Sequence, residues 1–213
     1  MIGEGKMDMR IDRLPSPTWK WLGVNYADVS ADMPEAAAPE ISVPAGSAVS
    51  VSRTDAEGCR EIRTGCGPDM FRLVDAAGDP AYRVSAAAGG KNAEPVIIRA
   101  DFAGGRSQAF RAVLRAEEDA DLTAVMVLSS APGAEGQAAV QTLIDAAPGA
   151  RVRLVLVDLL GSGFRLISDI GGRLGDSASA DIAAVILGGR EIYAGCSIDL
   201  AGDSSRLGAD AGT

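Results

Sequence analysis

The chain has no histidine among its 213 residues. Ser-His-Asp and Cys-His nucleophilic catalysis, histidine-based zinc sites and histidine acid–base chemistry are therefore excluded within this chain. The chemistry left to it uses carboxylate, lysine or cysteine side chains, unless the protein carries out no reaction at all.

Cysteine is also scarce, because the chain holds only Cys59, Cys66 and Cys196. Three cysteines in a chain of this size do not make a disulfide framework, and we expect a reduced, cytoplasmic protein. Cys59 and Cys66 lie seven residues apart with no second pair, which is a weak metal-binding pattern. Ordinary loop or half-buried thiols are the favoured interpretation of these two residues.

Long apolar runs and a positive charge balance are missing as well. The longest apolar run, 154–160, is interrupted by Asp158, so we expect no transmembrane segment. Lys6, Arg10 and Arg13 have no apolar stretch behind them, and no signal peptide is indicated. The formal net charge is −9 and the pI is about 4.6. Because such a surface repels phosphate backbones and anionic lipid, neither nucleic acid nor membrane is expected as a partner.

Three glycine-centred turns recur towards the end of the chain. Gly149, Gly175 and Gly202 are 26 and 27 residues apart. Short apolar segments of strand type separate them, at 152–160, 166–170, 182–187 and 192–200. A fixed interval of this size is typical of stacked supersecondary units that bury their apolar faces against one another. Since the units have the composition of strands, we expect a mainly β protein built as a β-solenoid.

We divide the sequence into three regions. Residues 1–39 form an N-terminal segment with a short helix at 18–22 and a linker at 36–39. Trp19 and Trp21 lie in that segment and either anchor it to the body or form a partner-docking surface. Residues 40–115 form a β-rich lead-in, with strands predicted at 41–46, 48–51, 71–74 and 95–102. Residues 116–213 form the solenoid core, which ends without a C-terminal cap.

A competing pattern indicates an α/β enzyme. A strand at 122–128, a helix at 135–147 and a strand at 153–160 followed by Gly161-Ser162-Gly163 would form the outline of a dinucleotide-binding βαβ unit. Leu166 occupies the place of the third glycine in that motif. The following segment is a poor helix because of its β-branched residues and the Gly171-Gly172 pair. Nucleotide binding through the Gly161 turn therefore stays an alternative.

The order and spacing of four segments resemble one known family. Segments 14–19, 136–145, 161–170 and 193–205 together resemble the SufB/SufD scaffold proteins of the SUF iron–sulfur cluster assembly system. The resemblance implies a right-handed parallel β-helix core, preceded here by the small N-terminal segment. It also implies assembly with a SufC-like ABC ATPase and with a SufB/SufD-type partner subunit or a second copy. A cysteine desulfurase as sulfur donor and a transient iron–sulfur cluster belong to the same expectation.

The resemblance also singles out Cys196 as a candidate sulfur acceptor. A core cysteine precedes a Leu-x-Gly-Asp-x-Ser turn in SufB-type members, and Cys196 precedes Leu-Ala-Gly-Asp-Ser-Ser at 200–205. The alternative is a small, inert cysteine that faces the solenoid interior. Family members usually continue through more rungs and a helical segment that docks the ATPase, so we expect either a fragment or a short member capped by a partner. The cluster-site residues of that distal region are not assigned here.

The sequence thus predicts a SufB/SufD-like scaffold subunit that is not an enzyme, with a partner stacking on the open end of the solenoid. Whether the role is SufB-like or SufD-like is left open. The alternatives are the nucleotide-binding enzyme described above and a non-catalytic β-solenoid interaction module unrelated to iron or sulfur.

Overall fold

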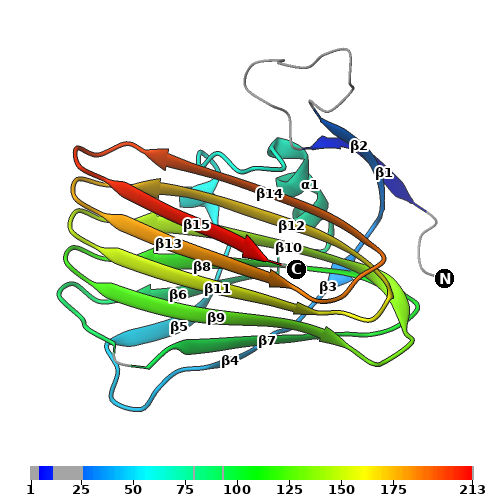
Figure 1. Cartoon of the computed structure of the whole chain (residues 1–213), viewed down its shortest axis with the longest axis horizontal. Helices are drawn as coiled ribbons and strands as arrows, with labels where there is room; N and C mark the ends of the chain where they lie inside the picture. Colours follow the sequence, from blue (N-terminus) through cyan, green and yellow to red (C-terminus); the bar gives the residue numbers. More distant parts are fainter. Residues whose placement is uncertain (1–4, 12–25, 79, 93, 213) are drawn as a thin grey trace.

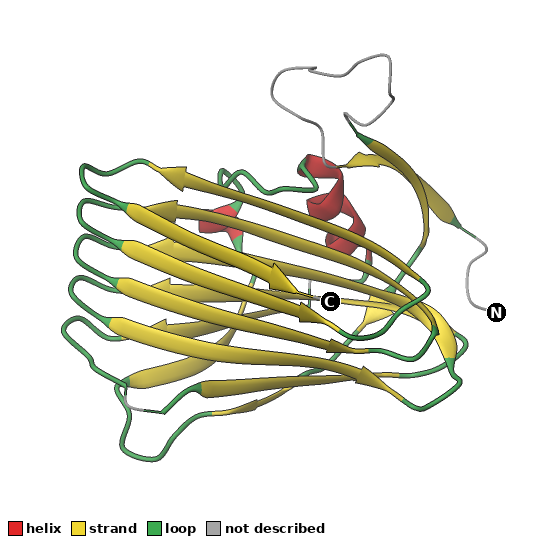
Figure 2. Cartoon of the chain, in the orientation of Figure 1, coloured by secondary structure: helices red, strands yellow, loops and turns green. Residues whose placement is uncertain are grey.

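The computed structural model describes residues 5–11, 26–78, 80–92 and 94–212. It is mainly β, with 61% strand and 6% helix, and it forms a parallel β-solenoid of about five rungs (Figure 2). The predicted solenoid architecture is confirmed. The predicted helix at 18–22, together with Trp19 and Trp21, lies outside the described residues. No helix in the described ranges is long and apolar enough to cross a membrane.

Each rung contributes one strand to each of two facing sheets (Figure 1). The first sheet contains β3 (Glu35–Ala36), β5 (Val49–Thr54), β6 (Ala81–Ala86), β8 (Arg106–Ala116), β10 (Glu135–Ala146), β12 (Gly163–Leu174) and β14 (Glu191–Leu200). The second sheet contains β4 (Glu40–Ser42), β7 (Val96–Phe102), β9 (Asp121–Ser130), β11 (Arg151–Leu159), β13 (Ser179–Ile186) and β15 (Arg206–Gly212).

Pairing within each sheet is parallel from β6 and β7 onwards, whereas β5 and β4 pair antiparallel and end the two sheets on one side. The sequence-based division between 115 and 116 falls inside β8, and β3 occupies the start of the predicted linker at 36–39.

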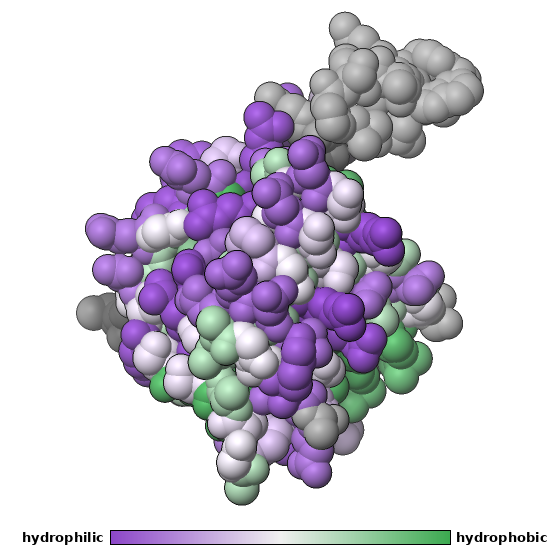
Figure 3. Space-filling view, turned by 90° about the vertical axis from the view of Figure 1, so that its left-hand side faces the viewer, coloured by the Kyte–Doolittle hydropathy of each residue, from purple (hydrophilic) through white to green (hydrophobic). Residues whose placement is uncertain are grey.

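Stacked turns join each first-sheet strand to the next second-sheet strand. One residue of every turn has a positive φ, and these residues are spaced by 30, 30, 28 and 27 positions: Gly89, Asp119, Gly149, Ser177 and Ser204. The backbone N–H of each of the first four donates to the carbonyl just before the next one, at 2.7–3.0 Å. This side of the molecule is largely hydrophilic (Figure 3). The decreasing spacing of the positive-φ residues shows that the rungs become shorter along the chain, instead of keeping a constant length.

Gly175 and Gly202, which helped to indicate the repeat, have a different structural role from Gly149. Gly149 occupies the positive-φ position of its turn, whereas Ser177 and Ser204 occupy that position in the next two turns. A Cβ at Gly202 would lie 2.1 Å from the carbonyl carbon of Gly175, so close stacking of the turns requires glycine there. The intervals of 26 and 27 residues were thus measured between glycines that do not occupy equivalent positions in their turns.

The core fills the space between the two sheets. Alternate residues of β8, β10 and β12 point inwards and meet alternate residues of β9, β11 and β13. Phe102 and Phe110 stack in this core with ring centroids 6.4 Å apart. Because parallel pairing keeps the rungs in register, inward positions repeat from strand to strand and give one continuous apolar interior.

A separate cover packs on the outer face of the first sheet. It consists of α1 (Pro68–Ala76), the short 3-10 helix η2 (Glu57–Cys59) and the antiparallel hairpin of β1 (Lys6–Ile11) and β2 (Ala27–Asp32). Buried Met70, Leu73 and Val74 of α1 pack in one cluster with Ala139 and Ile167 of the sheet. Figure 1 shows this cover on one side of the solenoid only.

Two sequence predictions were wrong in type. The strand predicted at 71–74 lies inside α1, because Pro68 suits the first helical position and the buried residues recur every three or four positions. The helix predicted at 135–147 is strand β10. Its middle is buried on both faces, by the core inside and by the cover outside, so it lacks the alternation typical of a half-buried strand.

Candidate functional site

Cys196 lies on β14, the last strand of the first sheet in the described chain. It is in register with Ile170 of β12, which belongs to the core, so its side chain points towards the solenoid interior. It borders a cavity of about 220 Å³ that is lined mainly by apolar residues, with Ser168 and Asp210 as its polar residues. The thiol is exposed because, within the described chain, β14 pairs on one side only. In the described chain Cys196 thus faces the interior and is also exposed, and its role as a sulfur acceptor stays a prediction.

The environment of Cys196 makes its thiol a weak acid. Although one side of the thiol is exposed, its partial burial against the cavity wall raises the pKa of Cys196 above its ordinary value, and the carboxylate of Asp169 raises it further. Since the thiolate is the nucleophilic form, the isolated chain holds this cysteine in its less reactive state at neutral pH.

A loop of the cover fixes the backbone on which Cys196 sits. Thr64 forms an antiparallel bridge with Gly171, and the N–H of Gly65 donates to the carbonyl of Ile170 at 3.2 Å. A Cβ at Gly65 would lie 2.0 Å from the backbone nitrogen of Cys196, so the loop contacts β14 directly. Gly171, of the Gly171-Gly172 pair that the sequence marked as unsuitable for a helix, provides room for this crossing, whereas a Cβ at Gly172 would meet Ile144 and Ile198 inside the solenoid.

The three cysteines do not converge on one site. Cys59 is buried in a cluster with Val113 and Leu143, and burial is the main cause that raises its pKa. Cys66 is buried under α1, where its N–H donates to Asp169 Oδ1 at 2.8 Å. Within the described ranges no three or more Cys, Asp or Glu side chains are grouped so as to hold a metal ion. These residues therefore do not form a complete ligand set for an iron–sulfur cluster.

The Gly161-Ser162-Gly163 turn does not lead into a helix. It enters strand β12, so the helix N-terminus that a dinucleotide phosphate needs is not formed at this turn. A Cβ at Gly163 would lie 2.6 Å from Cγ of Glu135 on the neighbouring rung. The glycine is thus needed for the packing of adjacent rungs, and the nucleotide-binding alternative loses its structural basis.

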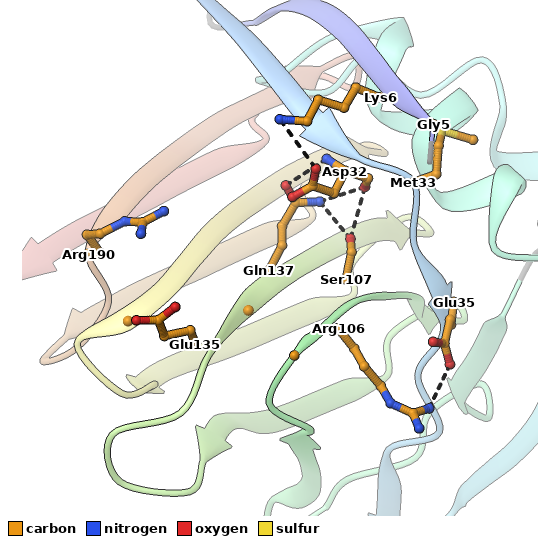
Figure 4. A pocket seen from close by; sticks show the side chains of 13 residues that line it. Gly5, Lys6, Asp32, Met33, Glu35, Arg106, Ser107, Glu135, Gln137 and Arg190 are labelled. Atoms are coloured by element: carbon orange, nitrogen blue, oxygen red, sulfur yellow. Dashed lines mark hydrogen bonds and ion pairs between the residues drawn. The ribbon is translucent and has the colours of Figure 1, made fainter. Parts of the chain in front are cut away.

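A second site lies on the opposite side from the stacked turns, between the β1–β2 hairpin and the starts of β8, β10 and β14. It is a polar cleft of about 840 Å³ (Figure 4). Gln137 holds the hairpin on its floor, accepting from the N–H of Asp32 at 3.1 Å and donating to the carbonyl of Asp32 at 2.9 Å. Ser107 donates to the same carbonyl at 2.9 Å.

Charges of both signs line this polar cleft. Lys6 pairs with Asp32 at 3.7 Å, and Arg106 pairs with Glu35 at 3.0 Å. Sequence reasoning missed the polar cleft because its residues come from segments up to about 185 positions apart, and only the solenoid with its hairpin brings them together. Of the residues that line the polar cleft, the sequence singled out Gly163 as a candidate site residue, but as part of the Gly161-Ser162-Gly163 nucleotide-binding turn.

Comparison with known proteins gives no match to a family model, to a curated protein or to a solved structure.

Proposed function

We propose that this protein is a non-enzymatic scaffold subunit in iron–sulfur cluster assembly, of the SufB/SufD type, acting in the cytoplasm. The parallel β-solenoid agrees with the fold that the sequence resemblance implies. The observation that carries the proposal is the position of Cys196, an exposed thiol in the mouth of the solenoid interior. A paralogous subunit and an ABC-type ATPase complete the working assembly.

The sulfur step that we propose is a thiol–persulfide exchange. The Cys196 thiolate attacks the outer sulfur of a persulfide carried by a cysteine desulfurase, and a new S–S bond forms at Cys196. The donor S–S bond breaks, and its electron pair leaves with the desulfurase cysteine as a thiolate. No further oxidant or reductant is required, because one persulfide replaces another.

The partner subunit supplies what this chain does not hold in its described part. Burial and Asp169 raise the pKa of Cys196, so a positive group from a partner is needed to increase the thiolate fraction. The cluster, as cargo, likewise takes most of its ligands from the partner. Within the described residues β14 and β15 each pair on one side only, and their other edges offer backbone groups on which partner strands continue both sheets.

The test is peptide mass spectrometry after anaerobic incubation with a cysteine desulfurase and L-cysteine. We expect one additional sulfur atom on Cys196, increasing with pH because its pKa is raised. Cys66 is a matched control, since it is buried and should gain none. Persulfide yield that is unchanged in Cys196→Ser would contradict the sulfur-acceptor role.

A second candidate, a β-solenoid interaction module unrelated to sulfur, is favoured by the unpaired strand edges alone. It predicts partner binding through β14 and β15 that is indifferent to Cys196→Ser. Retained partner binding without any persulfide on the wild-type protein would select this candidate.

A further inference from the structure

We propose that the polar cleft of Figure 4 binds a small zwitterion, with its carboxylate on Arg190 and its ammonium group on Glu135. This site goes beyond the scaffold function, because it lies on the side of the hairpin and involves neither Cys196 nor sulfur. The inference rests on which charges of the polar cleft are neutralised within the chain and which are not.

Most charges in the polar cleft are already paired. Lys6 and Arg106 have their carboxylate partners in Asp32 and Glu35. Glu191, at the start of β14, accepts from Nε of Arg165 at 2.7 Å. These pairs leave a binding role to the two remaining charged side chains of the polar cleft.

Those two side chains are Glu135 and Arg190. Among the described residues the Glu135 carboxylate has no hydrogen-bond or ion-pair partner. Arg190 reaches only Glu191, with Nε 3.8 Å from Oε1, and that carboxylate is already held by Arg165. Its terminal guanidinium nitrogens thus keep the geometry that binds a carboxylate in a bidentate manner. Figure 4 shows both side chains on the same side of the polar cleft, with no interaction drawn between them.

Gly163 lies between these two charges, and the Glu135 side chain packs over it. Glu135 is in register with Gly163 on β12, and the N–H of Arg190 donates to the carbonyl of Phe164, the residue after Gly163. Glu135 begins β10 and Arg190 directly precedes β14, two strands away, which places their backbones about 9–10 Å from each other. Because Gly163 has no side chain, the Glu135 side chain lies across β12, where a Cβ would be only 2.6 Å from its Cγ.

This arrangement selects a ligand with two opposite charges. A simple anion would be attracted by the Arg190 guanidinium but repelled by the Glu135 carboxylate. A simple cation would be attracted by Glu135 but repelled by Arg190. A molecule that carries an ammonium group and a carboxylate several bonds apart satisfies both and spans the start of β12. The chemical class is thus an ω-amino acid or an amino acid with its charges similarly separated.

The experiment is a titration of the protein with glycine, 4-aminobutanoate and 6-aminohexanoate, followed by amide NMR shifts. We expect saturable shifts at 105–107, 135–137, 163–165 and 190–191, strongest for the longer zwitterions. Hexanoate and hexylamine, which match 6-aminohexanoate in length but carry one charge, should bind at least tenfold more weakly. Glu135→Gln and Arg190→Gln should each weaken binding of the zwitterion about tenfold.

Matched control variants lie on the second sheet. Asp181→Asn and Arg153→Gln remove an exposed acid and an exposed base far from the polar cleft and should leave the titration unchanged. Equal binding of 6-aminohexanoate and hexanoate would overturn the proposal, as would binding that survives both cleft substitutions. No saturable shift up to about 10 mM of any zwitterion would overturn it as well. Thermal unfolding of each variant confirms that it is folded.

Discussion

Strands β10 and β11 belong to the same rung but have very different surroundings. From Gln137 to Ala146 every residue of β10 is buried, whereas β11 alternates between buried and more exposed positions. Both strands present one face to the same core. The difference arises on the outer faces, because the cover of α1, η2 and the hairpin packs on the first sheet, and no described element covers the second.

The cover also changes which polar residues are tolerated. Under it, Arg111 is fully buried and donates to Gln141 at 2.6 Å and to Asp75 at 3.0 Å, and Gln141 donates to Asp169 at 2.9 Å. On the second sheet, Arg153 and Asp181 form a 3.9 Å pair with 63% of each side chain exposed. The same charged residue types are thus structural in one sheet and solvated in the other.

Removing the buried guanidinium should give the largest effect. Arg111→Ala should lower the free energy of unfolding by about 3–5 kcal/mol, because it leaves Oδ1 of Asp75 and the buried Oε1 of Gln141 without their donor under the cover, although Arg60 still pairs with Oδ2 of Asp75. Arg153→Ala is the matched change on the second sheet and should cost at most about 0.5 kcal/mol. Denaturant unfolding of both variants measures the difference, and equal losses would show that the cover does not bury this network.

A smaller effect should follow from lifting the cover off the sheet. Gly65→Ala places a Cβ 2.0 Å from the backbone of Cys196, and we expect a loss of about 2 kcal/mol. Gly58→Ala, in the same cover but with no atom within 4 Å of the new Cβ, should be nearly neutral. Faster amide exchange in β14 of Gly65→Ala would locate the change, and unchanged exchange there would contradict the contact.

The smallest expected effects on stability come from two buried carboxylates, Asp158 and Asp169, which differ in their hydrogen-bond donors. Burial raises the pKa of Asp158, which faces the core, with Oδ1 accepting from the N–H of Leu160 and Oδ2 without a described partner. Burial also raises the pKa of Asp169, although its donors oppose that shift. A raised carboxyl pKa means that the folded state holds its proton more tightly than the unfolded state. The contribution of this tighter proton binding to the free energy of unfolding is complete below about pH 4, and it is lost as the pH rises through the pKa of the folded state.

Asparagine at each position distinguishes these environments. Asp158→Asn keeps an acceptor for Leu160 and should raise stability near pH 7 by about 1 kcal/mol while reducing its pH dependence. Asp169→Asn turns an NH₂ group towards one of its two donors, the N–H of Cys66 or the side-chain amide of Gln141, and should lower stability by about 1–2 kcal/mol. Unfolding curves between pH 4 and 8 test both signs, and a stability gain in both variants would contradict the assigned donor network.

Strands of both sheets were predictable where an apolar segment lies between turns. The segments at 122–128, 152–160 and 182–187 correctly marked β9, β11 and β13 of the second sheet, and those at 166–170 and 192–200 correctly marked β12 and β14 of the first. The segments at 135–147 and 71–74 were misassigned because the relevant burial comes from elsewhere in the chain. For the candidate sites, the sequence singled out Cys196, but Glu135 and Arg190 gave no local signal.

The sequence by itself determined a parallel stack of β-rungs, because strand-type apolar segments between turns cannot bury their faces singly. Only the tertiary structure decided the lengths of the rungs, the positive φ of Ser177 and Ser204, and the burial of Arg111 and Asp169. Periodicity is a local property of the chain, whereas burial of an outer face depends on a cover from residues 6–11, 27–32 and 55–76. The side that the cover occupies is set by packing, which short-range pattern does not encode.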